Sequence, residues 1–380
     1  MAAILNVRAI VNGYGFGPEF RDALLRLFDE NVSRVHSTTR ISNRALSIKT
    51  QEYRAAKLCK AFKELREGGF ALQTPWSLKE KHVKFLVGAW IRAGQSGGTI
   101  ENKLTYLRAF ARWMGKTNLV GSLDDYADRE ALGLKRSYVA TEDKSWAAHG
   151  VDAVAKIEEI AQTCPYTAVQ LKLQAAFGLR IEESFMLRPA EAVRNPRMLA
   201  VTRGTKGGRP REVPIETKIG ILEEAARLSN GLTGSTVPAD RTLSQWRDWY
   251  YYVLEKHGVT KRGMGITSHG LRHEYLQTLY KETTGVEAPI KRAGERPDPQ
   301  LHEQAMRRVV EAAGHSRLSK SGAYLSTFAM QDRMQRKLPT LDEARGELGA
   351  AAGNKSHAAK ALGISRQALY RILGDGEKQG

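Results

Sequence analysis

Apolar residues recur at helical spacing along most of this chain, and this periodicity limits the folds that are open to it. Residues 51–116 contain three such amphipathic segments, and the last has the sequence TIENKLTYLRAFARW. Further helical segments are predicted at 153–162, 167–177, 241–255, 271–281 and 300–313. Only two short β-type runs interrupt them, MLAVTR and REVPI, on either side of the turn TKGGRP. The sequence therefore predicts a mainly α fold with a small β-sheet, in the α+β class.

Chain length and local composition indicate several parts. The 380 residues exceed the size of one typical domain, and a polar stretch from Asp124 to Gly150 has the composition of a linker. We expect an N-terminal segment of uncertain structure (1–50), a helical domain (51–145), a domain that contains the hairpin (146–338) and a C-terminal tail (339–380). The tail includes NKSHAAKALGISRQALYRIL, in which two short apolar helices are separated by a glycine turn.

The charge balance indicates the class of partner. Lys and Arg number 59 against 41 acidic residues, which gives a formal net charge of +18 and a pI near 9.8. Such an excess concentrates polyanions near the surface, and nucleic acid is the most common polyanion in a cell. A soluble basic protein without such a partner remains an alternative on charge alone.

The cellular compartment is predicted from two further features. Only Cys59 and Cys164 are present, one on each side of the expected boundary, which argues against a disulfide framework and suits a reducing cytoplasm. The N-terminus lacks a basic leader followed by a sustained apolar run, and no stretch of about 18 apolar residues occurs. We therefore expect a cytoplasmic protein that has no membrane partner.

Several basic and polar side chains are candidates for nucleic-acid contact. In the tail, the two-helix pattern predicts a helix-turn-helix, and a purely structural hairpin is the alternative. In the helix around TIENKLTYLRAFARW, basic residues lie on or beside the polar side, although any helix has a solvated charged face. The candidates are Lys103, Arg108 and Arg112 in that helix, Arg209 and Arg211 in the hairpin, and Arg366, Gln367, Tyr370 and Arg371 in the tail.

A set of potentially reactive residues stands out in the second domain. They occur in GLRIEE after an apolar helix, at the hairpin tip, in SHGLRH at the start of a helix, and in GHSRLSKSGAY after another helix. The set consists of Arg180, Glu183, Lys206, His269, Arg272, His315 and Tyr324. Each residue alone has an ordinary structural explanation, but their order, spacing and secondary-structure context agree with one reaction.

That reaction is the cleavage of a phosphodiester by a tyrosine. Arg180 and Arg272 offer planar forks of donors that match phosphate oxygens, on which negative charge concentrates in the transition state. A tyrosine hydroxyl with a usual pKa of about 10 is a poor nucleophile near neutral pH. The arginines favour the phenolate of Tyr324, and His269 could accept its proton.

The remaining residues have supporting roles in this hypothesis. Lys206 on the turn could protonate the departing sugar oxygen, His315 could donate a hydrogen bond to the phosphate, and Glu183 could orient Arg180 or a histidine. His269 and His273 are one helical turn apart, a spacing that also suits zinc, but no third ligand is obvious. We therefore expect neither a metal nor another cofactor.

Four segments together resemble the catalytic domain of the tyrosine recombinase (phage integrase) family: GLRIEE, GTKGGRPREVPI, SHGLRH and AGHSRLSKSGAY, within residues 153–334. The resemblance implies two phosphate-binding arginines, a general-acid lysine, two active-site histidines and a nucleophilic tyrosine, namely Arg180, Arg272, Lys206, His269, His315 and Tyr324. Residues 51–116 resemble the family's helical core-binding (SAM-like) domain, and the tail resembles a Fis-type helix-turn-helix. The segment 283–299, predicted as a loop, is longer than is usual in the family.

The resemblance also implies partners and a biological setting. The partner would be double-stranded DNA, held as two synapsed sites by a homotetramer, with a monomer or dimer as the free form. Strands would be exchanged through a 3′-phosphotyrosyl intermediate at the bacterial nucleoid, to integrate or excise a mobile element. The alternatives are a type IB-like topoisomerase or telomere resolvase, which would use the same chemistry, and a non-catalytic regulator that binds DNA through the tail.

Overall fold

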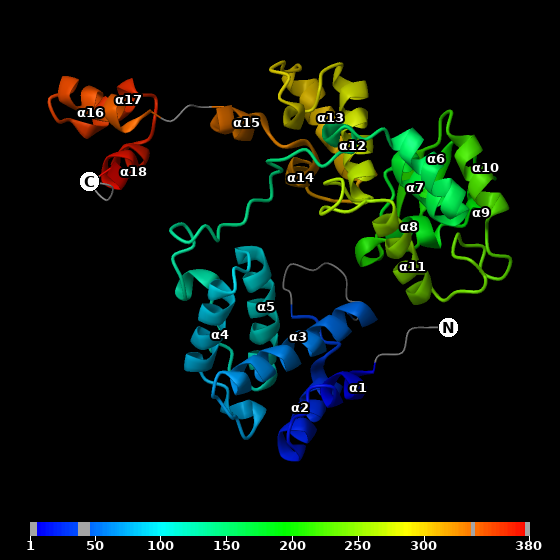
Figure 1. Ribbon diagram of the computed structural model, residues 1–380, viewed down its shortest axis with the longest axis horizontal. Coiled ribbons are helices and arrows are strands. Elements are labelled where there is room, and N and C mark those ends of the chain that lie inside the picture. Colours follow the sequence, from blue (N-terminus) through cyan, green and yellow to red (C-terminus); the bar gives the residue numbers. More distant parts are fainter. Residues whose placement is uncertain (1–5, 37–45, 336–338, 377–380) are drawn as a thin grey trace. The chain divides into compact units, whose positions relative to one another are not determined.

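The second half of the chain and the first form separate compact units. The computed structural model describes residues 6–36, 46–335 and 339–376, and the chain divides into residues 1–137 and 138–380 (Figure 1). The division falls inside the predicted polar linker, a few residues before the expected boundary at 145/146. The described residues are mainly helical and include one two-stranded sheet, so the predicted fold class is confirmed.

The first unit is helical throughout its described residues. Its α-helices are α1 (Val7–Asn12), α2 (Pro18–Asn31), α3 (Ile48–Glu67), α4 (Glu80–Arg92) and α5 (Gly97–Trp113), with 3₁₀ turns η1 (Pro75–Ser77) and η2 (Leu123–Asp125). All five helices contribute to one apolar core, so residues 6–36 belong to this domain and do not form a separate segment. The N-cap of α5 is Ser96, whose hydroxyl accepts a hydrogen bond from the Thr99 N–H.

The second unit is built around a buried helix. Its helices are α6 (Ala153–Thr163), α7 (Pro165–Phe177), α8 (Ile181–Met186), α9 (Pro189–Ala192), α10 (Ile219–Arg227), α11 (Leu243–Lys256), α12 (His269–Thr284), α13 (Pro299–Ala312), α14 (Gly322–Leu325) and α15 (Phe328–Gln335). Its 3₁₀ turns are η3 (Ala147–His149), η4 (Lys206–Gly208), η5 (Pro289–Lys291) and η6 (Leu318–Lys320). Helix α7 contacts α6, α8, α10 and α12, and most of its residues are buried. The buried amides of Gln170 and Gln174 in α7 have hydrogen-bond partners within the domain, as a helix at its centre requires.

The predicted hairpin is confirmed. Strands β1 (Met198–Val201) and β2 (Arg211–Pro214) are antiparallel, with Met198 opposite Pro214 and Val201 opposite Arg211. Alternate side chains, among them Leu199 and Val213, enter the core beside α7 and α10. The two strands are therefore fixed to the domain, while the turn η4 between them is exposed.

The chain that enters the second unit packs against α14. The Ala140 N–H donates to the Gly322 carbonyl at 2.8 Å, and the Lys320 ammonium lies 4.7 Å from the centre of the Tyr138 ring. The segment 283–299 begins as the last turn of α12, and it then buries Ala288 and Ile290 in the same apolar cluster as α14. Two segments distant in sequence therefore support the short helix α14.

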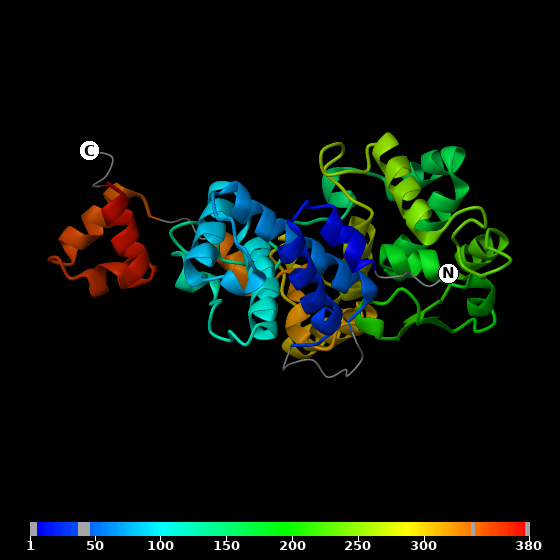
Figure 2. The ribbon, with the colours of Figure 1, turned by 90° about the horizontal axis from the view of Figure 1, so that it is seen from below.

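The tail folds on a small core of its own. Helices α16 (Leu341–Ala350), α17 (Lys355–Ala361) and α18 (Arg366–Gly376) pack on one another in both views (Figures 1 and 2). Its fully buried residues are Ala344, Ala358, Ala359 and Leu369. Between α17 and α18, Gly363 adopts a φ of 63°, and the Ser365 hydroxyl accepts from the Ala368 N–H. The predicted helix-turn-helix is confirmed, with α16 as a third, supporting helix.

Within the described residues, no helix combines the length and apolar character that crossing a lipid bilayer requires.

We expect Gly178→Ala to destabilise the second unit by about 2 kcal/mol or more, because both its backbone and its surroundings require glycine. Gly178 ends α7 with a φ of 58°, and a β-carbon there would lie 2.4 Å from the Tyr275 ring. Gly220→Ala in α10 is the matched control. It meets open space, and we expect it to stabilise the protein by about 0.5 kcal/mol. Urea unfolding measures both, and equal stability of the two variants would contradict the prediction.

Candidate active site

Arg180 is held at the junction between α7 and α8. Helix α7 ends at Gly178, and Arg180 is the N-cap residue of α8. Its backbone N–H donates to Glu183 Oε2 and its Nη1 donates to Glu183 Oε1, both at 2.7 Å. The predicted orienting contact between Glu183 and Arg180 is therefore present in the structure, and the buried carboxylate fixes the guanidinium to the start of the helix.

Arg211 binds the same carboxylate, contrary to its prediction as a DNA-facing residue. Its Nη1 and Nη2 each donate to one oxygen of Glu183 at 2.7 Å, and its side chain is only 4% exposed. Arg211 is the first residue of β2, and its side chain points to the buried face of the sheet. The guanidinium is thus enclosed in the protein, and it cannot reach a DNA surface in this structure.

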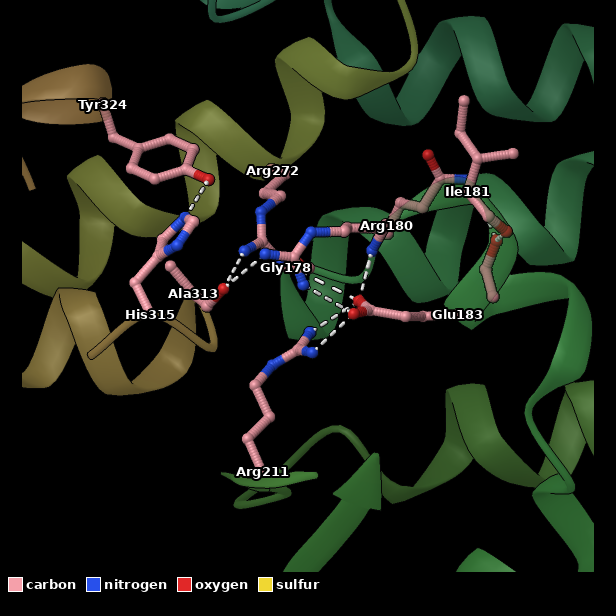
Figure 3. Close-up of polar contacts among 11 residues, drawn as sticks. Gly178, Arg180, Ile181, Glu183, Arg211, Arg272, Ala313, His315 and Tyr324 are labelled. Atoms are coloured by element: carbon pink, nitrogen blue, oxygen red, sulfur yellow. Dashed lines mark hydrogen bonds and ion pairs between the residues drawn. The ribbon is translucent and has the colours of Figure 1, made fainter. Parts of the chain in front are cut away.

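Arg272 converges with Arg180 on one carbonyl oxygen (Figure 3). Arg272 lies in the first turns of α12 and is completely buried. Its Nη1 donates to the Gly178 carbonyl, and its Nη2 donates to the Ala313 carbonyl at 2.5 Å. Arg180 Nη2 donates to the same Ala313 oxygen at 2.7 Å. The two predicted phosphate-binding arginines are therefore neighbours, although 92 residues separate them in sequence.

Tyr324 and His315 form the other side of this cluster. The Tyr324 hydroxyl lies 3.2 Å from His315 Nε2, and the Arg272 guanidinium carbon lies 5.6 Å from the centre of the Tyr324 ring (Figure 3). Tyr324 lies in α14 and is 6% exposed. His315 follows Gly314, whose φ of 64° turns the chain at the end of α13. Two elements that adjoin in sequence thus bring an imidazole to the phenol.

The structure places His315, and not His269, at the tyrosine hydroxyl. The His273 ring packs against the Tyr324 ring with centres 4.9 Å apart, and the His269 ring lies beyond it, 5.2 Å from that of His273. The sequence hypothesis had His269 as the proton acceptor of Tyr324 and His315 as a donor to phosphate. It considered His273 only as a zinc ligand and missed its contact with the tyrosine. The position of His273, one residue after Arg272 on a buried helix, could have indicated that it lies in the same cluster.

All three imidazoles have lowered pKa values. Burial and the charges of Arg272 and Arg180 lower the pKa of His269 to about 4, although part of its side chain reaches solvent. Burial lowers the pKa of His273 to about 3, with His269 as the next cause. For His315, burial and then Arg180, Arg272 and Lys206 lower the pKa to about 4. At neutral pH each ring is therefore uncharged and can accept a hydrogen bond, but burial and the neighbouring positive charges keep it a weak base while no phosphate lies beside it.

The carboxylate in this cluster remains ionised. Burial opposes the charge of Glu183, but the hydrogen bonds and charge of Arg211, with those of Arg180, outweigh it and lower the pKa to about 2. Lys206 is exposed on η4, and its positive charge is one of those that lower the pKa of His315. Arg209, predicted to contact DNA, is exposed on the same turn.

The predicted basic face of α5 is largely engaged within the first unit. Lys103, predicted to contact DNA, has a side chain that is 11% exposed, and its ammonium lies 4.3 Å from the centre of the Trp90 ring. Arg108 donates to Glu101 at 3.2 Å and to the Gly121 carbonyl at 3.3 Å. Arg112 is exposed and donates to the His36 carbonyl. Only Arg112 of the three presents a largely exposed side chain.

The described part of the tail presents the predicted residues outward. Arg366, Gln367, Tyr370 and Arg371 are exposed on α18, and Leu369 on the opposite side is buried. Among the residues that the structure describes, no group of three or more histidine, cysteine or acidic side chains is arranged to hold a metal ion.

Three family models match the sequence. The model described as integrase matches residues 138–278, the model of the phage integrase N-terminal region matches 39–120, and the model of the Fis family of bacterial regulatory proteins matches 348–373. The first match covers Arg180, Lys206, His269 and Arg272, and it ends before His315 and Tyr324. Those two residues are connected to the others by the geometry described above.

Solved structures resemble the fold. A lambda integrase dimer bound to a COC′ core site is 13% identical, with a TM-score of 0.50 over 88% of this chain and 83% of that one. The Tn1549 transposon integrase in complex with transposon right end DNA is 14% identical, with a TM-score of 0.46 over 87% and 99% of the two chains. The XerH recombinase bound to a palindromic difH substrate is 14% identical, with a TM-score of 0.44 over 93% and 98%. Among curated proteins, none matches this chain in sequence.

We expect the imidazole signals of His269, His273 and His315 to show no titration in NMR spectra between about pH 8 and pH 5, because their folded pKa values lie at about 4, 3 and 4. In the unfolded chain the same groups titrate near 6.5. The unfolded state therefore binds protons first, and the free energy of unfolding should fall as the pH drops from about 6.5 towards 4. The urea-unfolded protein is the control, and a midpoint near 6.5 for any of the three in the folded protein would contradict the prediction.

Proposed function

Because this chain belongs to the tyrosine recombinase (phage integrase) family, with a Fis-type helix-turn-helix tail, and is a site-specific recombinase, we propose that it cleaves and rejoins double-stranded DNA through a covalent bond to Tyr324. The observation that carries this proposal is the arrangement of Tyr324 beside His315 and Arg272, with Arg180 on the same carbonyl oxygen as Arg272. A nucleophile, a proton acceptor and two phosphate-binding groups are thus within one folded unit.

The cleavage step balances with these residues. The Tyr324 oxygen attacks the phosphorus, its proton passes to the neutral His315, and the bond from phosphorus to the 5′ oxygen breaks. Arg180 and Arg272 stabilise the charge that develops on the non-bridging oxygens. Lys206, on the exposed turn between two fixed strands, protonates the departing 5′ oxygen. The products are a 3′-phosphotyrosyl bond and a free 5′ hydroxyl.

Rejoining reverses this chemistry with a different hydroxyl. The 5′ hydroxyl of another strand attacks the phosphotyrosyl phosphorus, and Tyr324 leaves as the phenol. One phosphodiester is exchanged for another at each step, so the number of ester bonds is conserved and no nucleotide cofactor is needed. Four strands must be cut to exchange two duplexes, which favours a homotetramer on two synapsed sites, assembled from monomers or dimers.

DNA contacts are assigned to exposed basic residues. These include Lys206 and Arg209 on η4, Arg112 on α5, and Arg366 on α18. The solved lambda integrase is bound to a core DNA site, and the Tn1549 integrase to transposon end DNA. By analogy, the second unit of this chain would bind the cleaved site, and the tail would bind DNA as a separate module. Such an added DNA-binding module suits the integration or excision of a mobile element.

Tyr324→Phe should bind DNA with wild-type affinity but form no covalent adduct, since phenylalanine has no nucleophilic oxygen. The cleavage site is first selected by capturing the wild-type protein covalently on a library of nicked random duplexes. Adduct is then measured on the selected duplex after denaturation in detergent, and affinity is measured separately by gel shift. Tyr252→Phe, which changes an exposed tyrosine on α11, is the matched control and should retain the adduct. Adduct formation by Tyr324→Phe would reject Tyr324 as the nucleophile.

DNA affinity should depend steeply on salt, because phosphate contacts release bound cations. A clamp that makes six to ten such contacts loses a factor of about 10³–10⁵ in affinity between 50 and 200 mM salt. Arg366→Ala should reduce the slope of log affinity against log salt by about one, whereas Arg366→Lys should preserve it. Fluorescence anisotropy with a duplex measures all three proteins. A flat response of the wild-type protein would contradict a phosphate-binding clamp.

A further inference from the structure

We propose that Arg211 is a positioning residue of the recombination reaction, which acts through Glu183 on Arg180 and through Gly314 on His315. This inference rests on the proposed function, because it gives Arg211 a part in the same site. The sequence suggested a DNA contact for Arg211, but the structure gives its guanidinium an internal partner. Its two terminal nitrogens face the two oxygens of Glu183 in a fork-to-fork arrangement, each at 2.7 Å.

Arg211 changes the balance of charge around Glu183. Glu183 is fully buried and carries one negative charge, which Arg180 alone would largely neutralise. Arg211 supplies a second guanidinium to that carboxylate, and Arg272 lies 4.0 Å from it. Three positive charges against one leave an excess of two. With Arg211 present, the net charge around Arg180 and Arg272 is positive and can attract a phosphate, while Glu183 still fixes the orientation of Arg180.

Arg211 also restricts the orientation of the Glu183 carboxylate. Each oxygen of Glu183 accepts one bond from Arg211 and one from Arg180. With Arg211 on one side, the carboxylate can rotate neither towards nor away from Arg180 without breaking a charge-assisted bond. Lysine has a single point of charge and cannot provide this two-point contact, so Arg180 alone would then hold both oxygens of the carboxylate.

On its other side, Arg211 lies beside the chain at Gly314. A β-carbon at Gly314 would lie 3.3 Å from Arg211 Cδ and 3.6 Å from Arg180 Nη1, so the chain at the end of α13 lies directly against both arginine side chains. The next residue is His315, whose Nε2 lies 3.2 Å from the Tyr324 hydroxyl. Arg211 thus contacts the segment that positions the imidazole, as well as the carboxylate that positions Arg180.

The position of Arg211 at the start of β2 links it to the turn of the hairpin. Arg211 pairs with Val201 across the sheet and lies three residues after the end of η4, the exposed turn that contains Lys206. It therefore joins three elements that carry proposed catalytic residues: the hairpin, the start of α8 and the end of α13. A side chain in that position is suited to keeping the general acid, the phosphate-binding arginine and the histidine in register.

The test measures the rate constant of covalent adduct formation at saturating nicked duplex, together with the final amount of adduct and the DNA affinity. For Arg211→Lys we expect the rate constant to fall between about tenfold and a hundredfold, since a displacement of about 1 Å at a positioning contact can cost a hundredfold. The final amount of adduct per molecule of active protein should stay within about twofold of wild type, and so should the DNA affinity. Glu212→Gln, the neighbouring exposed residue of β2, is the matched control and should leave the rate constant unchanged.

The readouts separate positioning from folding. A purely structural role would lower the melting temperature and the adduct yield, while the folded fraction would react at the wild-type rate constant. That result, or a rate constant within twofold of wild type, would overturn the proposal. Arg211→Met leaves a buried carboxylate with fewer partners and can fail to fold. Glu183→Gln removes the carboxylate through which Arg211 acts on Arg180. The proposal therefore requires Arg211→Lys to lower the rate constant by a smaller factor in the Glu183→Gln protein than in the wild-type protein.

The controls also separate this proposal from the proposed function. If wild-type protein forms no adduct with any duplex of the library, the proposed function fails. If wild-type protein forms adduct and Tyr324→Phe does not, the proposed function stands, and the Arg211→Lys rate constant then decides the role of Arg211 by itself.

Discussion

A single buried carboxylate organises the second unit of this recombinase. Glu183 is fully enclosed, and its ionised state is stable because four charge-assisted and backbone hydrogen bonds replace the water that it has lost. Those bonds tie the start of α8 to strand β2, and the arginines extend the connection to the ends of α7 and α13. Removing one partner of such a group leaves an uncompensated charge in the interior, so this carboxylate and its arginines form an interdependent unit.

Much of this arrangement could be predicted from the sequence, because it depends on local patterns. The alternation in REVPI predicted a strand, the motifs predicted the proximity of Arg180, Arg272, His315 and Tyr324, and the glycine turn in the tail predicted the helix-turn-helix. The identity of the histidine at the tyrosine hydroxyl could not be predicted. That contact depends on how α12, α13 and α14 pack, and packing angles are not encoded in the spacing of a few polar residues.

Two basic residues that were predicted to contact DNA have internal partners in the structure, and the sequence held a signal for each. Arg211 is two residues before Val213 and four before Ile215, both of which are buried. Side chains two apart on a strand point to the same face of the sheet. Lys103 is three residues after Ile100 and four before Leu107, which places it beside the apolar side of α5. A basic residue was read as a surface residue in both cases, although its periodicity placed it with the core. Residues 6–36 were not assigned to the helical domain, because their place in it depends on tertiary packing: α1 packs against α3, and the Phe20 ring of α2 packs against the Phe62 ring of α3.

The carbonyl of Ala313 carries a consequence for affinity. In the protein alone, one peptide oxygen at the end of α13 accepts from Arg180 and Arg272 together. An oxyanion that reaches these guanidinium groups exchanges one set of hydrogen bonds for another, so its net gain is a difference and not a sum. Free phosphate, with no other contacts to contribute, is therefore a weak competitor for the site. A phosphate within a long duplex would bring the attraction of its neighbouring phosphates, so such a site would bind a phosphate polymer in preference to small anions.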